Sequence, residues 1–299
     1  MIPLVYHPHY IAPLKPGHRF PMSKYGYLRE ELVSRGLLPP TGGFIAPAPA
    51  SVRQVAAVHD LGYVERVAGH RILPDEVRRI GLPNTAAVAR RAFLSAAGTL
   101  LAARLAFEHG IACNMAGGSH HAGPAGGAGF CVFNDVAVAA QSLLDEGLVR
   151  RVLIIDCDVH QGDGTADIFR DNPRVFTLSL HAEKNYPARK ARSDLDFPLP
   201  DGLKDAAYLE LLDHALDRLD GFAPDIVFYN AGVDPHEEDR LGRLALTSEG
   251  LRAREARVIA FARQRGVPFT GVLGGGYDEN PERLAARHAI LFEEAARYG

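Results

Sequence analysis

The segment Arg151–Gly164, RVLIIDCDVHQGDG, combines an apolar run with side chains that can bind a metal ion. The run Val152–Ile155 has no polar alternation, which is typical of a strand buried on both faces of a parallel sheet. Asp156, Asp158 and His160 follow at a spacing of two, so in extended backbone their side chains point to the same side. Because unpaired buried charges are costly, this pattern predicts a bound cation where the strand ends.

A catalytic zinc needs three protein ligands and one open position for water. Asp158, His160 and Asp234 supply two carboxylates and one imidazole, which meets that requirement. Two carboxylates also neutralise most of the charge of the metal, so its bound water is less acidic than at a site built from histidines alone. The pattern therefore predicts that a general base assists.

The candidates for this base are His120 and His121, in the glycine-rich segment AGGSHHAGPAGGAGF. A neutral imidazole acts as a base when its second nitrogen is held, usually by a carboxylate. Asp156 and Asp163 lie in the neighbouring loop and can each orient one histidine. Tyr277 follows a run of three glycines and can donate its hydroxyl to an oxyanion.

Strands and helices alternate along most of the chain and position these side chains. We expect strands at 4–6, 111–115, 152–155, 175–180, 226–229 and 268–273, with helices at 25–35, 51–57, 85–109, 133–146, 166–170, 204–219, 248–265 and 281–298. This alternation predicts a three-layer α/β fold with a mostly parallel sheet, in a single domain spanning 1–299. Ligands bind such sheets outside the carboxyl ends of the strands, and the polar candidates all lie there.

Composition excludes several other classes of protein. The chain has 299 residues and a net charge of −3, with basic residues scattered, so we expect no nucleic-acid partner. The apolar stretch 86–107 is interrupted by three arginines, which indicates a packed helix rather than a membrane span. Three cysteines without a C-x-x-C pair, and a first segment unlike a signal peptide, predict a cytoplasmic protein with no membrane partner.

Four segments carry a resemblance to a known family: GGSHHAGPAGGAGFCVFND, DCDVHQGDGT, YNAGVD and LGGGY. Together, and in this order, they resemble the histone deacetylase family, in the broad sense that includes bacterial acetoin-utilisation proteins and acetylpolyamine amidohydrolases. The resemblance extends from about Leu4 to the last helix. The segments PGHRFPMSKYGYLRE and HAEKNYP are most similar to the class IV branch and its bacterial relatives.

The resemblance implies an arginase-like α/β fold that binds zinc through Asp158, His160 and Asp234. Metal-bound water would attack the carbonyl of an N-acyl amide, and Tyr277 would stabilise the oxyanion beside the metal. The substrate would be an acylated lysine in a peptide or protein, or a related acylated amine. Iron(II) or cobalt(II) can also occupy an oxygen and nitrogen site of this kind.

The resemblance also implies roles for the two histidines. His120 would pair with Asp156, and it would assist electrostatically. His121 would pair with Asp163, and it would be the main proton shuttle. Its base and acid steps would move a proton from the attacking water to the departing amine.

Further residues would form the substrate tunnel and a second ion site. Phe130 would line the tunnel, and the carbonyl of Gly129 would accept a hydrogen bond from the substrate amide. No residue matches the second aromatic wall cleanly, and Tyr186 is a candidate for it. The family often binds a monovalent cation such as potassium, whose ligands here would come from Asp156, Asp158, His160, Ser179 and Leu180.

Other functions fit part of the pattern. An acetylpolyamine amidohydrolase shares the centre, and acidic residues at the pocket mouth would favour it, while a deacylase for longer acyl chains needs a wider or deeper tunnel. A binding module that reads acylated lysine needs no proton shuttle, and an arginase needs a second set of metal ligands. The complete ligand and base sets therefore favour an amidohydrolase.

The remaining histidines and two cysteines have simpler interpretations. We interpret His7, His9, His59 and His181 as ordinary structural histidines. Cys131 and Cys157 lie close to the candidate site in sequence but lack ligand spacing, so we interpret both as small buried hydrophobic residues.

Overall fold

The computed structural model describes residues 2–38 and 43–299. Seven strands in these residues form one sheet in the order β1-β2-β7-β6-β3-β4-β5, and each neighbouring pair is parallel. The strands are β1 (Leu4–Val5), β2 (Ile111–Asn114), β3 (Val152–Asp156), β4 (Val175–Ala182), β5 (Leu195–Leu199), β6 (Ile226–Asn230) and β7 (Phe269–Val272). The predicted parallel sheet is thus confirmed.

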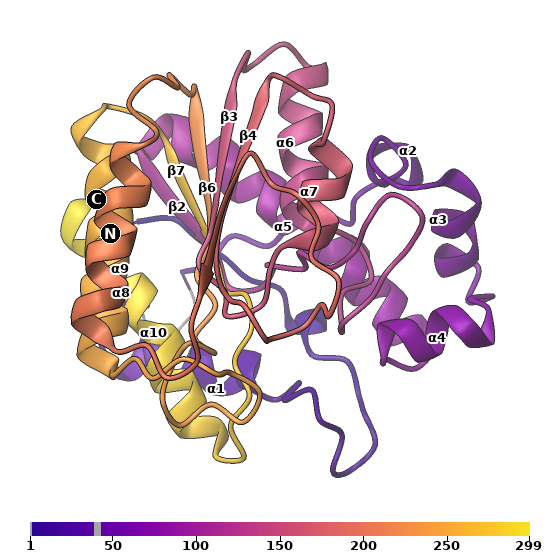
Figure 1. Ribbon diagram of the computed structural model, residues 1–299. Helices are drawn as coiled ribbons and strands as arrows, with labels where there is room; N and C mark the ends of the chain where they lie inside the picture. The colour runs from indigo at the N-terminus through magenta and orange to yellow at the C-terminus, as the bar shows by residue number, and fades with distance from the viewer. Residues whose placement is uncertain (1, 39–42) are drawn as a thin grey trace.

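Helices cover both faces of this sheet (Figure 1). One layer contains α1 (Lys24–Ser34), α8 (Asp205–Asp217), α9 (Ser248–Gln264) and α10 (Pro281–Tyr298). The other contains α5 (Ala86–His109), α6 (Asp135–Asp145) and α7 (Asp163–Phe169). The short helices η1 (Pro8–Tyr10), α2 (Val52–Val55), α3 (Leu61–Ala68) and α4 (Pro74–Ile80) complete the described elements. This arrangement confirms the expected three-layer α/β fold.

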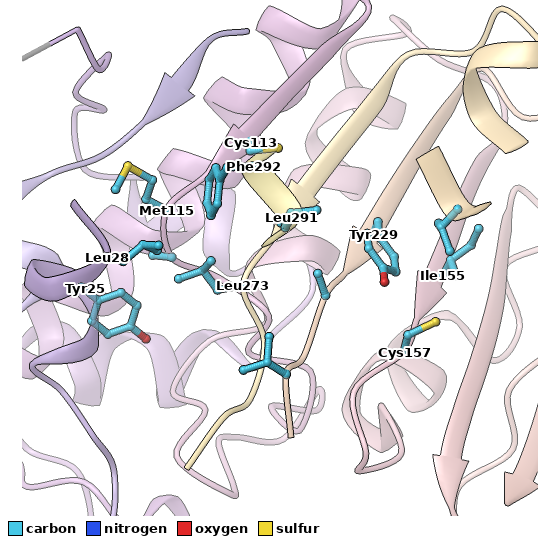
Figure 2. Close-up of a cluster of buried hydrophobic side chains, with 14 of the residues drawn as sticks. Tyr25, Leu28, Cys113, Met115, Ile155, Cys157, Tyr229, Leu273, Leu291 and Phe292 are labelled. Carbon is cyan, nitrogen blue, oxygen red and sulfur yellow. The ribbon is translucent and has the colours of Figure 1, made fainter. Parts of the chain in front are cut away.

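The central strand β3 is buried on both faces, as its uninterrupted apolar run predicts. Leu153 and Ile155 belong to the core under α1 and α8–α10, whereas Val152 and Ile154 belong to the core under α5 and α6. Figure 2 shows the first of these cores, where Ile155 lies near Tyr229 of the neighbouring strand β6. Packing on both sides fixes the position of the strand whose carboxyl end carries the candidate ligands.

The alternation pattern does not predict β5. This strand, LDFPL, lies at the edge of the sheet, is partly exposed and contains Pro198. Proline lacks a backbone N–H donor and is tolerated in sheets mainly at edges. Because polar and apolar residues are mixed in this segment, its sequence lacks the apolar pattern that indicates a strand. Its pairing with β4 extends the sheet beyond the candidate site.

Helix α5 is the one described helix that is long and apolar enough to cross a membrane by length and composition. Within its most apolar stretch, 67% of the residues are buried inside the protein. It packs against α6 and beside β2 and β7. These contacts are those of a core helix, in agreement with the interpretation of 86–107 as a packed segment.

Candidate active site

The three candidate metal ligands converge at the carboxyl ends of two adjacent strands. Asp158 and His160 follow β3, and Asp234 follows β6, which pairs with β3. Nδ1 of His160 lies 3.0 Å from Oδ1 of Asp158 and 3.0 Å from Oδ2 of Asp234, and all three side chains are buried. Among residues 2–38 and 43–299, they form the one group of at least three His, Cys, Asp or Glu side chains that can hold a metal ion.

The donor set fits a divalent cation. Ligand atoms about 2.0–2.1 Å from a tetrahedral zinc lie roughly 3.3 Å from one another, close to the separations seen here. Burial and the adjacent Asp158 carboxylate raise the pKa of Asp234 above its ordinary value, because two negative charges are crowded in a dry site. Burial opposes a charge on His160, but hydrogen bonds to the two carboxylates outweigh it and raise its pKa to about 10. The site thus attracts positive charge.

Backbone amides orient the carboxylates. Gly275 donates its N–H to Oδ2 of Asp158 over 2.6 Å, and Val159 donates to Oδ1 of Asp234 over 2.8 Å. A Cβ atom at position 275 would lie 2.1 Å from Oδ2 of Asp234, so only glycine fits there. The glycine run after β7 therefore allows the backbone to approach both acidic ligands.

The two histidines of the glycine-rich loop each contact one carboxylate. Nδ1 of His120 lies 2.7 Å from Oδ2 of Asp156. Nδ1 of His121 lies 2.6 Å from Oδ1 of Asp163 at the start of α7. The two Nε2 atoms are 3.2 Å apart, beside the metal-binding group. The structure thus brings together both pairs that the family resemblance implies.

These surroundings separate the proton affinities of the two imidazoles. Burial alone lowers the pKa of His120, but the carboxylates of Asp156 and Asp158 outweigh it and raise the value to about 9. Burial lowers the pKa of His121 to about 4, and the neighbouring His120 adds to this effect. At neutral pH the His121 imidazole is therefore uncharged and can accept a proton, whereas the His120 imidazole is doubly protonated and positively charged.

Tyr277 lies beside the metal-binding group, with its ring centroid 6.2 Å from that of His160 and its ring perpendicular to the His160 ring. Burial and the charge of Asp234 raise the pKa of Tyr277 well above its ordinary value. The phenol therefore stays protonated and can donate a hydrogen bond to developing negative charge on a substrate oxygen.

A pocket of about 270 Å³ leads to this centre. Phe130 and Tyr186 both line it, and the Tyr186 ring stands edge-on to His121 with 4.8 Å between the ring centroids. Gly129 and Phe130 have φ values of 53° and 66°, a left-handed conformation that is costly for phenylalanine and turns the loop at the pocket wall. Phe130 and Tyr186 are thus two aromatic residues in the lining of this pocket, and the role of Tyr186 as the second wall of a substrate tunnel stays a prediction.

Comparison with known proteins identifies the family. The model of the histone deacetylase domain matches residues 18–292. The chain is 32% identical to histone deacetylase 2 of Arabidopsis thaliana over 279 residues, which cover 90% of this chain and 72% of the relative. The chain belongs to the histone deacetylase family. Membership supports deacetylase activity, the hydrolysis of an amide.

Other relatives of this histone deacetylase family member include bacterial and archaeal proteins. An uncharacterized protein of Picosynechococcus sp. is 47% identical over 294 residues, 98% of each chain. A probable deacetylase of Archaeoglobus fulgidus is 30% identical over 297 residues, 92% of this chain and 80% of the relative. The crystal structure of the HDA15 HD domain superposes with a TM-score of 0.83 at 24% identity, covering 98% of this chain and 88% of that chain. This structural match confirms the arginase/deacetylase-like fold.

The family resemblance assigns five residues to a monovalent cation. Two of them, Asp158 and His160, belong to the metal-binding group, and the other three lie on β3 and β4. Asp156 on β3 pairs in register with Ser179 on β4, and Leu180 follows Ser179. Oγ of Ser179 lies 3.0 Å from Nδ1 of His181, and Oδ1 of Asp156 accepts from the N–H of Asp158 over 3.1 Å. These contacts bring Asp156, Asp158 and Ser179 together, and the N–H of His160 donates to Oδ1 of Asp158 over 3.0 Å. The role of the five residues in binding a cation stays a prediction.

The sequence offered no distinctive signal for four further polar residues in this histone deacetylase family member. Lys24, buried on α1, donates to the carbonyl of Gly274 over 3.1 Å, and Arg91 lines the inner end of the site. Asn185 donates to the carbonyl of Leu241 over 2.6 Å and lies 3.4 Å from Nε2 of His160. Asp239 holds the backbone of the catalytic tyrosine candidate. Each acts through contacts distant in sequence, which spacing does not reveal.

Asp239 fixes the position of Tyr277. Its Oδ2 accepts from the Tyr277 N–H over 2.7 Å, and its Oδ1 accepts from Leu241 and Gly242 over 2.8 and 3.0 Å. Replacing it with alanine removes all three bonds. Burial and the charge of Asp234 raise the pKa of Asp239 to about 7, so its carboxyl is only partly ionised at neutral pH. Each of these hydrogen bonds is therefore worth roughly 0.5–1.5 kcal/mol, and we expect kcat to fall about tenfold because the phenol is no longer held in place.

This effect should appear in kcat, with KM and bound metal unchanged, when Asp239→Ala is compared with the exposed Glu237→Ala variant in steady-state kinetics. Asp239→Asn keeps part of the acceptor set and should recover part of the lost rate. An unchanged kcat in Asp239→Ala would contradict the role.

His59 supports the loop that carries the two candidate catalytic histidines. Its Nδ1 lies 2.8 Å from the carbonyl of Gly123, and its Nε2 accepts from the N–H of Asn134 over 2.9 Å. These partners require a neutral ring with its proton on Nδ1. The interpretation of His59 as a structural histidine agrees with this geometry.

The same contacts predict a pH-dependent stability. Burial lowers the pKa of His59 to about 4, below about 6.5 for an unfolded histidine, so the unfolded chain binds more protons between these values. The stabilisation is complete above pH 6.5 and is lost as the pH falls toward 4. Glutamine at position 59 keeps a hydrogen-bond donor and an acceptor but does not titrate. When the pH is lowered from 7 to 5, we therefore expect the free energy of unfolding to fall by roughly 1–2 kcal/mol less in His59→Gln than in the wild type.

Urea unfolding at the two pH values measures this difference, with the exposed His109→Gln variant as control. Equal losses for the wild type and His59→Gln would show that His59 does not contribute.

Proposed function

We propose that this histone deacetylase family member is a zinc-dependent deacetylase that removes acetyl groups from N-acylated lysine. The observation that carries the proposal is the convergence of two His–Asp pairs, the metal-binding group and Tyr277 on one pocket. A module that only binds acylated lysine does not need two oriented imidazoles, His120 with a raised pKa and His121 with a lowered pKa.

The residues of the chain divide the chemistry among them. Zinc, when bound by Asp158, His160 and Asp234, would polarise the amide carbonyl and make water more acidic. His121 is neutral at physiological pH and oriented by Asp163, so it accepts a proton from the attacking water.

The same site stabilises the developing charge and completes proton transfer. Tyr277 donates its hydroxyl to the carbonyl oxygen as negative charge develops there. The charge on His120, held by Asp156, stabilises the anionic transition state. A proton then passes from the histidine pair to the departing amine, while the carbonyl of Gly129 accepts from the substrate amide.

Cavity size supports a short acyl group. Beyond the metal-binding group, the inner cavity has a volume of about 30 Å³ and is lined in part by Tyr25, Arg91 and Gly118. A single water needs about 10–15 Å³ measured in this way, so the space corresponds to about two waters. An acetyl methyl group fits there, whereas a long alkyl chain does not.

The proposal is tested by turnover of acetyl-, trifluoroacetyl- and myristoyl-lysine peptides and of acetylated polyamines by zinc-loaded protein. We expect acetyl-lysine to be hydrolysed, myristoyl-lysine to be a poor substrate, and a chelator or a hydroxamate to abolish turnover. Binding of acetyl-lysine without any turnover by the metal-loaded protein would overturn the catalytic roles.

A further inference from the structure

A second cavity adjoins the substrate pocket. That cavity has a volume of about 260 Å³ and is lined by Arg19, Arg240, Leu241, Tyr277 and Asp278. Arg19, Leu241 and Tyr277 also line the substrate pocket. The two cavities therefore adjoin one another, and we call them together the groove; it extends from His160 of the metal-binding group to Arg240, and Arg19 lines both of its parts.

This groove has a positive charge that the protein itself does not neutralise. Arg19 is exposed and forms no ion pair with any residue in the described parts of the chain. Among the described residues that line the groove, Asp278 is the one carboxylate, and it is already bound by Arg283 and Arg287 over 2.8 and 2.9 Å. Arg240 pairs with Glu279 over 2.7 Å, but both side chains are more than half exposed, so this pair is weak and exchangeable.

We propose that Arg19 selects substrates that carry a carboxylate beside the acylated amine, such as an acyl-lysine peptide with Asp or Glu next to the modified lysine. This inference rests on the proposed function and names the substrate class for it. A guanidinium offers paired N–H donors that match a carboxylate, and one that lies at a pocket mouth without a partner is available to a ligand.

The same charge disfavours polycationic substrates. An acetylated polyamine would place its free ammonium groups in this groove, where Arg19 repels them and where no described lining residue offers an unpaired carboxylate to attract them. A small acylated amino acid with its own carboxylate shares the favoured chemistry. The experiment therefore includes free acetyl-lysine alongside peptides whose ends are blocked.

The test compares three blocked acetyl-lysine peptides that differ only in the flanking residue, which is Glu, Ala or Lys. At low salt we expect the wild type to prefer the Glu peptide over the Lys peptide about fivefold in kcat/KM, mainly through KM. Salt should reduce this preference, because the contact is exposed. Arg19→Gln should abolish it, and Arg19→Glu should reverse it.

Arg174→Glu makes the same charge change at the other end of the sheet, before β4, and should leave the preference unchanged. Binding of the same peptides, labelled with a fluorophore, to the zinc-loaded protein measures the preference independently of turnover. If the Ala peptide is hydrolysed and Arg19→Glu keeps the wild-type ratio, the role of Arg19 is overturned and the proposed function stands.

If no peptide is hydrolysed but binding shows the charge preference and its reversal, the proposed function fails and the role of Arg19 stands. A preference for the Glu peptide identifies a flanking side chain as the source of the carboxylate. A preference confined to free acetyl-lysine identifies a small anionic substrate instead.

Discussion

Replacing Asp234 with asparagine is expected to remove metal binding and nearly all turnover. Asp234 supplies one of the two carboxylates that lie around Nδ1 of His160, and its other oxygen is fixed by the Val159 N–H. A neutral amide keeps the shape but lowers the negative charge of the site by one. Because a catalytic metal contributes several kcal/mol, and about 4 kcal/mol corresponds to a thousandfold in rate, we expect kcat/KM to fall roughly a thousandfold or more.

Metal analysis of the purified protein and steady-state kinetics measure the two losses together. Asp167→Asn, on the exposed side of α7, makes the same chemical change outside the site and should retain metal and activity. If Asp234→Asn kept a full complement of metal and its normal rate, Asp234 would not be a ligand.

Replacing Tyr277 with phenylalanine is expected to lower kcat about a hundredfold or more while leaving metal content unchanged. The ring packs 6.0 Å from Phe130, and the backbone N–H is held by Asp239, so phenylalanine preserves the fold around it. What it removes is the hydroxyl that donates to the developing oxyanion. Since this interaction strengthens only in the transition state, KM should change little.

Steady-state kinetics with an acetyl-lysine peptide measures kcat and KM, and metal analysis of the purified variant measures its zinc content. Tyr298→Phe, near the end of α10 and partly exposed, is a matched control that should behave as the wild type. Near-full activity in Tyr277→Phe would contradict the role of Tyr277 in stabilising the oxyanion. Loss of zinc in the same variant would indicate a structural role for Tyr277 instead.

The local part of the site could be predicted because it depends on short-range geometry. Asp156 is the last residue of the buried strand β3, and Asp158 and His160 follow within four residues, so chain connectivity alone keeps them at its carboxyl end. The apolar run of β3 also predicted burial on both faces, since successive side chains alternate between them. In contrast, β5 was not predicted, because an exposed edge strand with a proline carries little apolar signal.

The sequence by itself determined the α/β class, the strand ends that carry polar groups, and the chemical types of donor, base and acid. Only the tertiary structure decided which of these groups meet. The sheet order places β6 beside β3 and so brings Asp234 within 3.0 Å of His160, and packing of separate loops puts Asp239 on the backbone of Tyr277 and Arg19 at the pocket mouth. Spacing along a strand is fixed by covalent geometry, whereas contacts between distant segments depend on how the whole core packs.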